Sequence, residues 1–279
     1  MRRRPCNYKS GQMNHMKIID AHAHIFPDKI AVKASESIGH FYDIPMYSDA
    51  SSHSLLEKEE QIGTERILVC SSALAPAQVI SINDFIAAEC KEHPKFIGFG
   101  GMHKDFEDFD AELDRMKELG LVGVKFHNDM QQYDIDDPKM YPIYKAMSDK
   151  GLKLLLHMGD DRYDYSAPQR MAKIAREFPE LIILASHFGG YQRWEDAYRN
   201  PKFENVFYDT SSSLPFIDRN TALRLIERFG EDHFFFGTDF PMWKPKTELE
   251  RFLNLKLGDE SNEKILYKNF VRVFGLEEA

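Results

Sequence analysis

The sequence predicts an α/β protein in which eight parallel strands form a single-domain (β/α)₈ barrel. Short apolar runs alternate along the chain with longer amphipathic stretches. The runs are apolar at nearly every position, which indicates strands buried on both faces, as in a parallel sheet. Eight such units in about 260 residues fit a closed TIM-type barrel, with an open doubly wound sheet as the structural alternative. The predicted strands are Lys17–His22, Arg66–Ser71, Phe96–Gly101, Val122–His127, Leu152–His157, Leu181–His187, Asn205–Asp209 and His233–Asp239.

The stretches between these runs have the pattern of helices. In Phe106–Leu119, apolar residues recur at helical spacing. Three other stretches begin with proline, which is favoured in the first turn of a helix, and three glycines stand where a left-handed cap is expected. These features are Pro138–Lys150, Pro168–Phe178 and Pro215–Phe229, followed by Gly120, Gly151 and Gly230 after helix ends.

Two segments depart from this alternation. Residues 24–54 form a predicted loop of about thirty residues that carries several aromatic side chains, and loops of that length are often lids or binding loops. Residues 246–274 are predicted to form one or two helices that close the barrel. We assign residues 16–279 to one barrel domain. Residues 1–15 have a basic start but no apolar core of a secretory signal, so we expect a flexible N-terminal extension.

Composition and charge exclude several classes of function. The formal net charge is -9 and no basic stripe is present, so we expect no nucleic-acid partner. No segment approaches the roughly 20 apolar residues of a membrane span. The cysteines, Cys6, Cys70 and Cys90, lack metal-motif spacing and cannot all pair, which favours a reducing, cytoplasmic location. A small molecule is the expected partner.

Histidines gather at the predicted carboxyl ends of the strands. The first strand ends in His22 and His24, and residues two apart in a strand point to the same face, so both can reach one ion. Six of the eleven histidines, His22, His24, His103, His127, His157 and His187, fall within a residue or two of such ends, and the last strand ends in Asp239. In a barrel of this kind the chemistry is located at these ends. The sequence therefore predicts a metal site there, with His103 and His127 at its rim.

The expected chemistry is that of a divalent metal ion. Nitrogen ligands with a carboxylate suit zinc, and also Fe(II), Mn(II) or Co(II). Three histidines and an aspartate leave a position for water, which the ion acidifies into a nucleophile. Asp239 is then a metal ligand and a catalytic proton acceptor. His187 is either a ligand of a second ion or a catalytic group that polarises the water and stabilises an oxyanion.

The chain resembles the amidohydrolase superfamily, specifically its amidohydrolase-related branch. The resemblance rests on four motifs: Asp20-Ala-His-Ala-His-Ile-Phe-Pro27, Leu156-His-Met-Gly159, Ser186-His-Phe-Gly-Gly190 and Gly237-Thr-Asp-Phe-Pro241. Their order and spacing extend over nearly the whole chain. The branch includes aminocarboxymuconate-semialdehyde decarboxylase, resorcylate-type decarboxylases and pyrone-dicarboxylate lactonase.

The resemblance implies a metal ion held by His22, His24, His157 and Asp239, with His187 beside it. Lys125, on the predicted fourth strand, stands where binuclear superfamily members carry a carboxylated lysine that bridges two ions. The branch often works with one ion, so we expect one ion, zinc, and treat Lys125 as a candidate ligand of a second. Homo-oligomers are common in the branch.

Two functions follow from this comparison. The first is a metal-dependent hydrolase of a small carboxylate, lactone, ester or amide, and the alternative is a non-oxidative decarboxylase, a lyase. Arg162 and Arg193 follow the fifth and sixth predicted strands and are candidates for binding a substrate carboxylate, which arginine does through paired hydrogen bonds. The site residues do not separate the two reactions, which share one metal centre.

Overall fold

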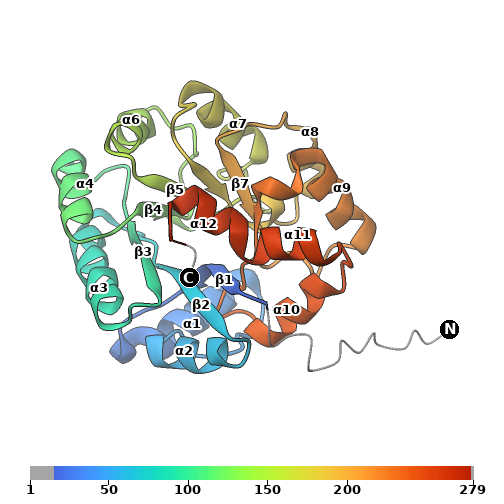
Figure 1. The fold of residues 1–279 in the computed structure, drawn as a ribbon. Coiled ribbons are helices and arrows are strands. Elements are labelled where there is room, and N and C mark those ends of the chain that lie inside the picture. The colour runs from blue at the N-terminus through green and yellow to red at the C-terminus, as the bar shows by residue number, and fades with distance from the viewer. Residues whose placement is uncertain (1–15, 278–279) are drawn as a thin grey trace.

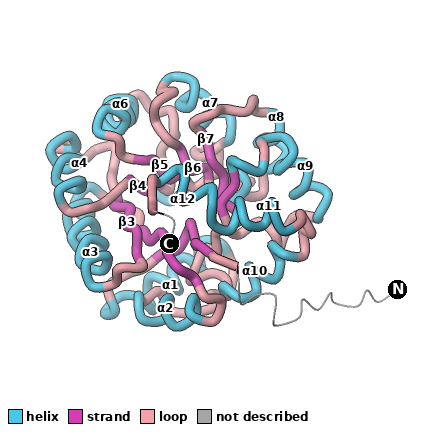
Figure 2. The backbone as a smooth tube through the Cα atoms, in the orientation of Figure 1, coloured by secondary structure: helices cyan, strands magenta, loops and turns pink. Residues whose placement is uncertain are grey.

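A computed structural model describes residues 16–277, and within them eight parallel strands pair in the order β1 to β8. Figure 2 shows the strands as an inner ring with helices around it. The predicted barrel is confirmed. The strands are β1 (Ile18–His24), β2 (Thr64–Cys70), β3 (Phe96–Gly101), β4 (Gly123–Phe126), β5 (Lys153–Leu156), β6 (Ile183–Ala185), β7 (Val206–Asp209) and β8 (Phe234–Phe235). The predicted extension at residues 1–15 lies outside the described part of the chain.

The last strand is short, yet its continuation joins the first strand and brings the sheet round into a barrel. The backbone N–H of Ala21 donates to the carbonyl of Phe236 at 2.9 Å, and that of Asp239 donates to the carbonyl of His22 at 2.8 Å. A further bridge pairs Ala23 with Phe240. These contacts place Asp239 beside the two histidines of β1.

Helices cover the outside of the barrel, as Figure 1 shows. Each predicted helix is confirmed within a few residues at its ends. The largest difference from the prediction is at the start of α9, which begins four residues after Pro215. Asp218 caps this helix by accepting hydrogen bonds from the N–H groups of Asn220 and Thr221. The larger helices of the wall are α3 (Val79–Glu92), α4 (Phe109–Glu118), α6 (Met140–Lys150), α7 (Pro168–Glu177), α8 (Trp194–Arg199), α9 (Arg219–Phe229) and α10 (Pro245–Leu253).

Residues 24–54, predicted as a loop, contain a full helix instead. Helix α1 spans Asp28–Tyr42, and α2 (Ser52–Glu60) follows it. The buried face of α1 consists of Ala31, Ser35 and Gly39, four residues apart. Ile30 and Ile38 do recur at helical spacing, but the first is exposed and the second only partly buried, so the buried face itself lacks the large apolar residues that usually mark a helix. A Cβ at Gly39 would lie 2.8 Å from the carbonyl oxygen of Ile44, so the close packing requires glycine there.

The C-terminal segment closes one end of the barrel, as predicted, but it contains three helices, α10 to α12, where one or two were expected. Short helices α11 (Asp259–Glu263) and α12 (Asn269–Phe274) are joined by a π-helical turn, and α12 crosses the front of the barrel in Figure 1. Phe270 and Phe274 stack on each other at 3.9 Å and pack against Phe235 inside the barrel. That end is therefore filled by side chains, and the chemistry has to be sought at the other. No helix of the described residues combines the length and the apolar character needed to cross a membrane.

Candidate metal centre

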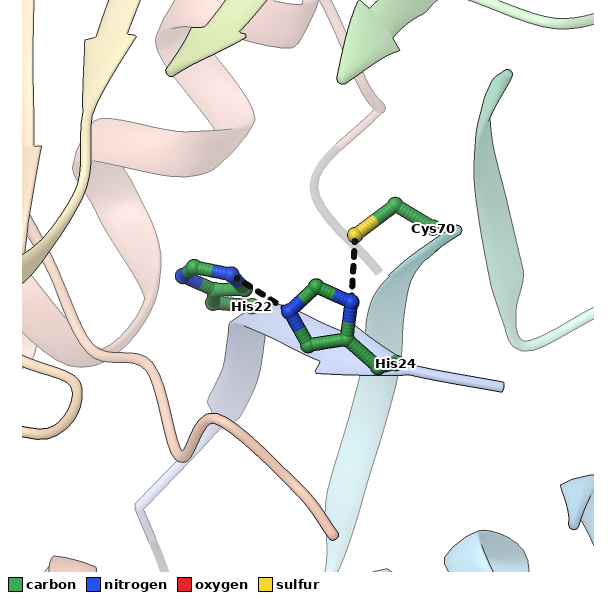
Figure 3. Close-up of side chains that lie close together, drawn as sticks. All are labelled: His22, His24 and Cys70. Atoms are coloured by element: carbon green, nitrogen blue, oxygen red, sulfur yellow. Dashed lines mark hydrogen bonds between the residues drawn. The ribbon is translucent and has the colours of Figure 1, made fainter. Parts of the chain in front are cut away.

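Three ligand atoms meet at the carboxyl ends of β1 and β8. The Nε2 atoms of His22 and His24 are 3.2 Å apart. The Oδ1 atom of Asp239 lies 3.7 Å from Nε2 of His22 and 3.3 Å from Nε2 of His24. Figure 3 shows the ring of His24 between His22 and the thiol of Cys70, whose Sγ is 3.6 Å from Nδ1 of His24.

Two further histidines reach the same place from β5 and β6. His157 directly follows β5, and His187 begins a short 3₁₀ turn, η3 (His187–Gly189), after β6. Nε2 of His187 is 3.1 Å from Nδ1 of His157, and the ring of His187 stacks on that of His22 at 5.3 Å. The structure thus brings all five predicted residues of the centre together.

Outer hydrogen bonds decide which nitrogen of each ring faces the centre. Nδ1 of His22 donates to Oδ2 of Asp209 at 2.9 Å, and Nε2 of His157 donates to the carbonyl of Gly159 at 2.9 Å. The hydroxyl of Ser211 donates to Asp209, so it accepts from Nδ1 of His187 at 2.9 Å. A neutral imidazole has one N–H and one lone pair. The lone pairs of His22, His157 and His187 therefore all face the centre.

This arrangement fits a bound cation. The lone pairs of His157 and His187 face each other with no hydrogen of these rings between them, and that of His22 lies near the carboxylate of Asp239. Outer partners that fix the tautomer and orientation of each ring are typical of metal-binding histidines. Three groups of possible ligand atoms lie within 4.8 Å of one another in the described residues, and each includes a histidine of the cluster: His22, His24 and Cys70; His22, His187 and Asp209; and His127, Asp129 and His157. The donor set, nitrogen atoms with carboxylate, suits a divalent transition metal.

The electrostatics keep His22 and Asp239 in the forms that bind metal. Burial lowers the pKa of His22 to about 4, and Lys125 adds to this effect. Burial alone would raise the pKa of Asp239, but His22 and His24 outweigh it and hold that pKa well below its usual range. The pKa of His24 is lowered by burial yet raised overall to about 9 by Cys70 and Asp239. Cys70 and Asp239 therefore favour a positive charge at His24, and a metal ion bound there would replace the proton of this ring.

Lys125 lies against this cluster at the end of β4. Its Nζ is 3.2 Å from Nε2 of His22, and its side chain is fully buried. Burial lowers its pKa, which favours the neutral amine. The lysine is thus within reach of the centre.

A small apolar cavity of about 130 Å³ opens directly onto the cluster. Its floor is formed by His24, His157, His187 and Asp239. Its walls come from α1, from the segments after β1, β2 and β4, and from the segment after Asp239. The other lining residues are Phe26, Ala34, Ser37, Ile38, Tyr42, Met46, Ser72, Leu74, His127, Met130, Pro241 and Met242.

Comparison with known proteins identifies the family. The amidohydrolase family model matches residues 19–276, nearly the whole chain. The chain belongs to the amidohydrolase family. The predicted resemblance is thereby confirmed. The amidohydrolase family is an enzyme family, and in this member the histidines and the aspartate of the four motifs gather at one end of the barrel.

Its similar proteins are mainly decarboxylases. A 2-amino-3-carboxymuconate-6-semialdehyde decarboxylase of Dictyostelium discoideum is 31% identical over 143 residues, a match that covers 48% of this chain and only 38% of that protein. A dihydroxybenzoic acid decarboxylase from a Polaromonas species, solved with manganese and 2-nitroresorcinol, has a TM-score of 0.70 at 19% identity, covering 95% of this chain and 98% of that one. A putative 2-pyrone-4,6-dicarboxylic acid hydrolase from Pseudomonas putida has a TM-score of 0.68 at 18% identity, covering 95% and 100%.

Two candidate arginines of this amidohydrolase lie away from the cavity lining. The guanidinium of Arg162 pairs with Asp160 at 2.7 Å and stacks on the ring of Phe41. The guanidinium of Arg193 pairs with Asp164 and Asp196 at 2.7 and 2.9 Å. Both positive charges are therefore matched by carboxylates of the chain itself.

The two histidines expected at the rim differ from each other. His127 lines the cavity and stacks on His157 with ring centroids 4.0 Å apart. His103 packs on Tyr133 with centroids 5.3 Å apart and is not among the lining residues. Only His127 is thus part of the amidohydrolase site.

Sequence reasoning missed three residues that shape the centre. Asp209 ends β7 and holds His22, and its position at a predicted strand end was a usable signal. Ser212 donates a hydrogen bond to Oδ2 of Asp239 and accepts one from Trp243 at 2.8 Å. Tyr42 lines the cavity from the end of α1. Neither Ser212 nor Tyr42 belongs to a motif that marks it in the sequence.

Proposed function

We propose that this amidohydrolase is a metal-dependent, non-oxidative decarboxylase of a small apolar carboxylic acid. The observation that carries the proposal is the cavity, whose walls are largely apolar and whose floor is formed by His24, His157, His187 and Asp239. A flat carboxylic acid fits such a cavity with its carboxylate directed to the floor. The sequence match to a decarboxylase supports the same reaction class.

In this proposal His22, His24, His157 and Asp239 hold one divalent ion. The ion supplies positive charge that orients the substrate carboxylate and acidifies water. Zinc was the sequence-based expectation, and manganese in a solved relative makes both metals candidates. Lys125 beside His22 is the candidate ligand if a second ion binds.

The chain's own residues then position the substrate and manage protons. Asp239 has Oδ2 fixed by Ser212, which leaves Oδ1 facing the centre to take a proton from a water molecule and pass it to the carbon that loses CO₂; the hydroxide left behind combines with CO₂ as bicarbonate. His187 presents its Nε2 lone pair to the centre from the segment after β6. The apolar walls exclude water, which strengthens the electrostatic interactions in the site.

The test is a substrate panel scored for two products at once. The metal-loaded protein would be incubated with aromatic and unsaturated carboxylic acids and with lactones, esters and amides. We expect CO₂ to be released in proportion to the acid consumed, with no hydrolytic product. Consumption of a lactone, ester or amide to give a new acid without CO₂ would contradict the proposal.

Hydrolysis is the second candidate function. It was the first expectation from the sequence, and the ligand set serves both reactions. Structural similarity to a putative pyrone-dicarboxylate hydrolase keeps it in consideration. The same panel decides between them, because only hydrolysis consumes water at a scissile bond.

A further inference from the structure

The hydroxyl of Tyr42 enters the cavity from the last residue of helix α1. It is one of the few polar groups on walls that are otherwise apolar. Its oxygen lies 2.6 Å from Nε2 of His127 and 3.4 Å from Nε2 of His157. The directions of these two hydrogen bonds can be worked out from the other contacts of the two rings.

The first hydrogen bond runs from His127 to Tyr42. Nδ1 of His127 accepts a hydrogen bond from the backbone N–H of Met130 at 3.3 Å. That nitrogen therefore carries a lone pair, and the ring's hydrogen is on Nε2. The N–H of His127 is thus the donor, and the oxygen of Tyr42 is the acceptor.

The second contact cannot use the hydrogen of Tyr42 either. Nε2 of His157 donates to the carbonyl oxygen of Gly159 at 2.9 Å, so it carries a hydrogen and has no lone pair to offer. No other hydrogen-bond partner of the Tyr42 hydroxyl occurs among residues 16–277. The phenolic hydrogen is therefore left for a group inside the cavity.

The charge of the lining limits what that group can be. Among the described residues, no lysine or arginine lines the cavity. Lys125 is buried against His22, and Arg162 is held by Asp160 and by the carbonyl oxygen of Phe41. A second carboxylate would be buried in the cavity without a partner charge, which is strongly unfavourable.

We propose that Tyr42 is a specificity-determining residue that donates its hydroxyl hydrogen to an uncharged oxygen of a substrate with a single carboxylate. The inference rests on the proposed function in one respect, that the carboxylate is bound at the metal. The hydroxyl or keto oxygen that accepts the hydrogen bond from Tyr42 is then on the remaining, apolar part of the substrate. This selects against acids that lack such an oxygen and against dicarboxylic acids.

The test is calorimetric binding of simple aromatic acids to the manganese-loaded protein. The probes are benzoate, its three monohydroxy isomers and benzene-1,3-dicarboxylate, and the proteins are the wild type, Tyr42→Phe and Tyr191→Phe. Tyr191 is the matched control because its ring packs edge-on against Tyr42 at 5.7 Å but is not part of the cavity lining. Metal content is measured in each preparation, so that a loss of metal is not mistaken for a loss of binding.

We expect one hydroxybenzoate to bind the wild type about tenfold more tightly than benzoate, the gain from one good hydrogen bond. Tyr42→Phe should remove this preference and leave benzoate binding unchanged, whereas Tyr191→Phe should retain it. The dicarboxylate should bind at least about tenfold more weakly than benzoate in all three proteins.

Three results would overturn the inference: a preference that survives in Tyr42→Phe, an equal weakening of benzoate in that variant, or no binding of any monocarboxylate by the wild type. The readout is independent of turnover. If the hydroxyl preference depends on Tyr42 but no CO₂ is released from any acid, the decarboxylase proposal fails while the role of Tyr42 stands.

Discussion

At the scale of single residues, the centre depends on partners that the sequence does not reveal. His22, His24, His157, His187 and Asp239 could be predicted because each follows or ends an apolar run. Their orientation could not. The contact between His22 and Asp209 joins residues 187 positions apart, and although Asp209 ends a predicted strand, nothing local in the sequence shows that it holds His22.

Asp209→Asn should weaken metal binding without unfolding the barrel. Burial raises the pKa of Asp209, but His22 outweighs burial and holds the pKa well below its usual range, so the residue is a carboxylate that holds the His22 ring. Loss of such a partner typically weakens metal binding by about 10- to 100-fold. Competition with a chelating dye measures the change. The control is Asp218→Asn at the cap of α9, which should bind metal as tightly as the wild type. If Asp209→Asn and Asp218→Asn have equal metal affinities, the role of Asp209 is refuted.

At the scale of elements, the regular wall of the barrel could be predicted and the cover of the cavity could not. Strands and outer helices follow simple apolar periodicities. Helix α1 instead packs through the small residues Ala31, Ser35 and Gly39, so its buried face is not marked by large apolar residues although it supplies much of the cavity wall. The turn after β5 shows the same dependence on a small residue. Gly159 has φ +78°, and an added Cβ would lie 2.5 Å from the carbonyl oxygen of Tyr191.

Gly159→Ala should cost more stability than Gly151→Ala and should also weaken metal binding. Gly151 has φ +71° with nothing within 4 Å of an added Cβ, so alanine there costs about 1 kcal/mol for backbone strain alone. At Gly159 the clash with backbone adds to that strain and displaces the carbonyl that orients His157. Unfolding in denaturant and metal titration of both variants measure the two effects. Equal destabilisation with unchanged metal affinity would show that the turn does not position His157.

At the scale of the whole molecule, the two ends of the barrel have different tasks. Phenylalanines of α12 fill one end, and the histidine cluster lies at the other. This division could be predicted because parallel strands place all their carboxyl ends on one side. The barrel also buries several carboxyl groups outside the centre. Glu248 of α10 is one of these, and burial raises its pKa to about 7 although Arg251 pairs with it.

Glu248→Gln should be less destabilising at pH 8 than at pH 5. The pKa of Glu248 is about 7 in the folded protein, above the usual value of 4.5. Between these two pH values the folded protein keeps a proton on Glu248 that the unfolded chain releases, so the free energy of unfolding falls as pH rises from about 4.5 to about 7. Glutamine removes this loss, and the change in unfolding free energy relative to wild type should differ by about 1 kcal/mol or more between the two pH values. Denaturant unfolding of chelator-treated protein measures it. The control, Glu250→Gln at an exposed position of the same helix, should show no such difference; a difference of equal size there would rule out burial of Glu248 as the cause.

The most direct test of the account is the metal content of the wild type, His157→Ala and His103→Ala by elemental analysis. The lone pair of His157 faces the centre, whereas His103 packs on Tyr133 outside the cavity. We expect about one ion per chain in the wild type and in His103→Ala, as in catalytic sites with three or four protein ligands. His157→Ala should remain folded and lose most of its metal. Full retention of metal in His157→Ala, or a wild type that binds none, would contradict the assignment of the centre.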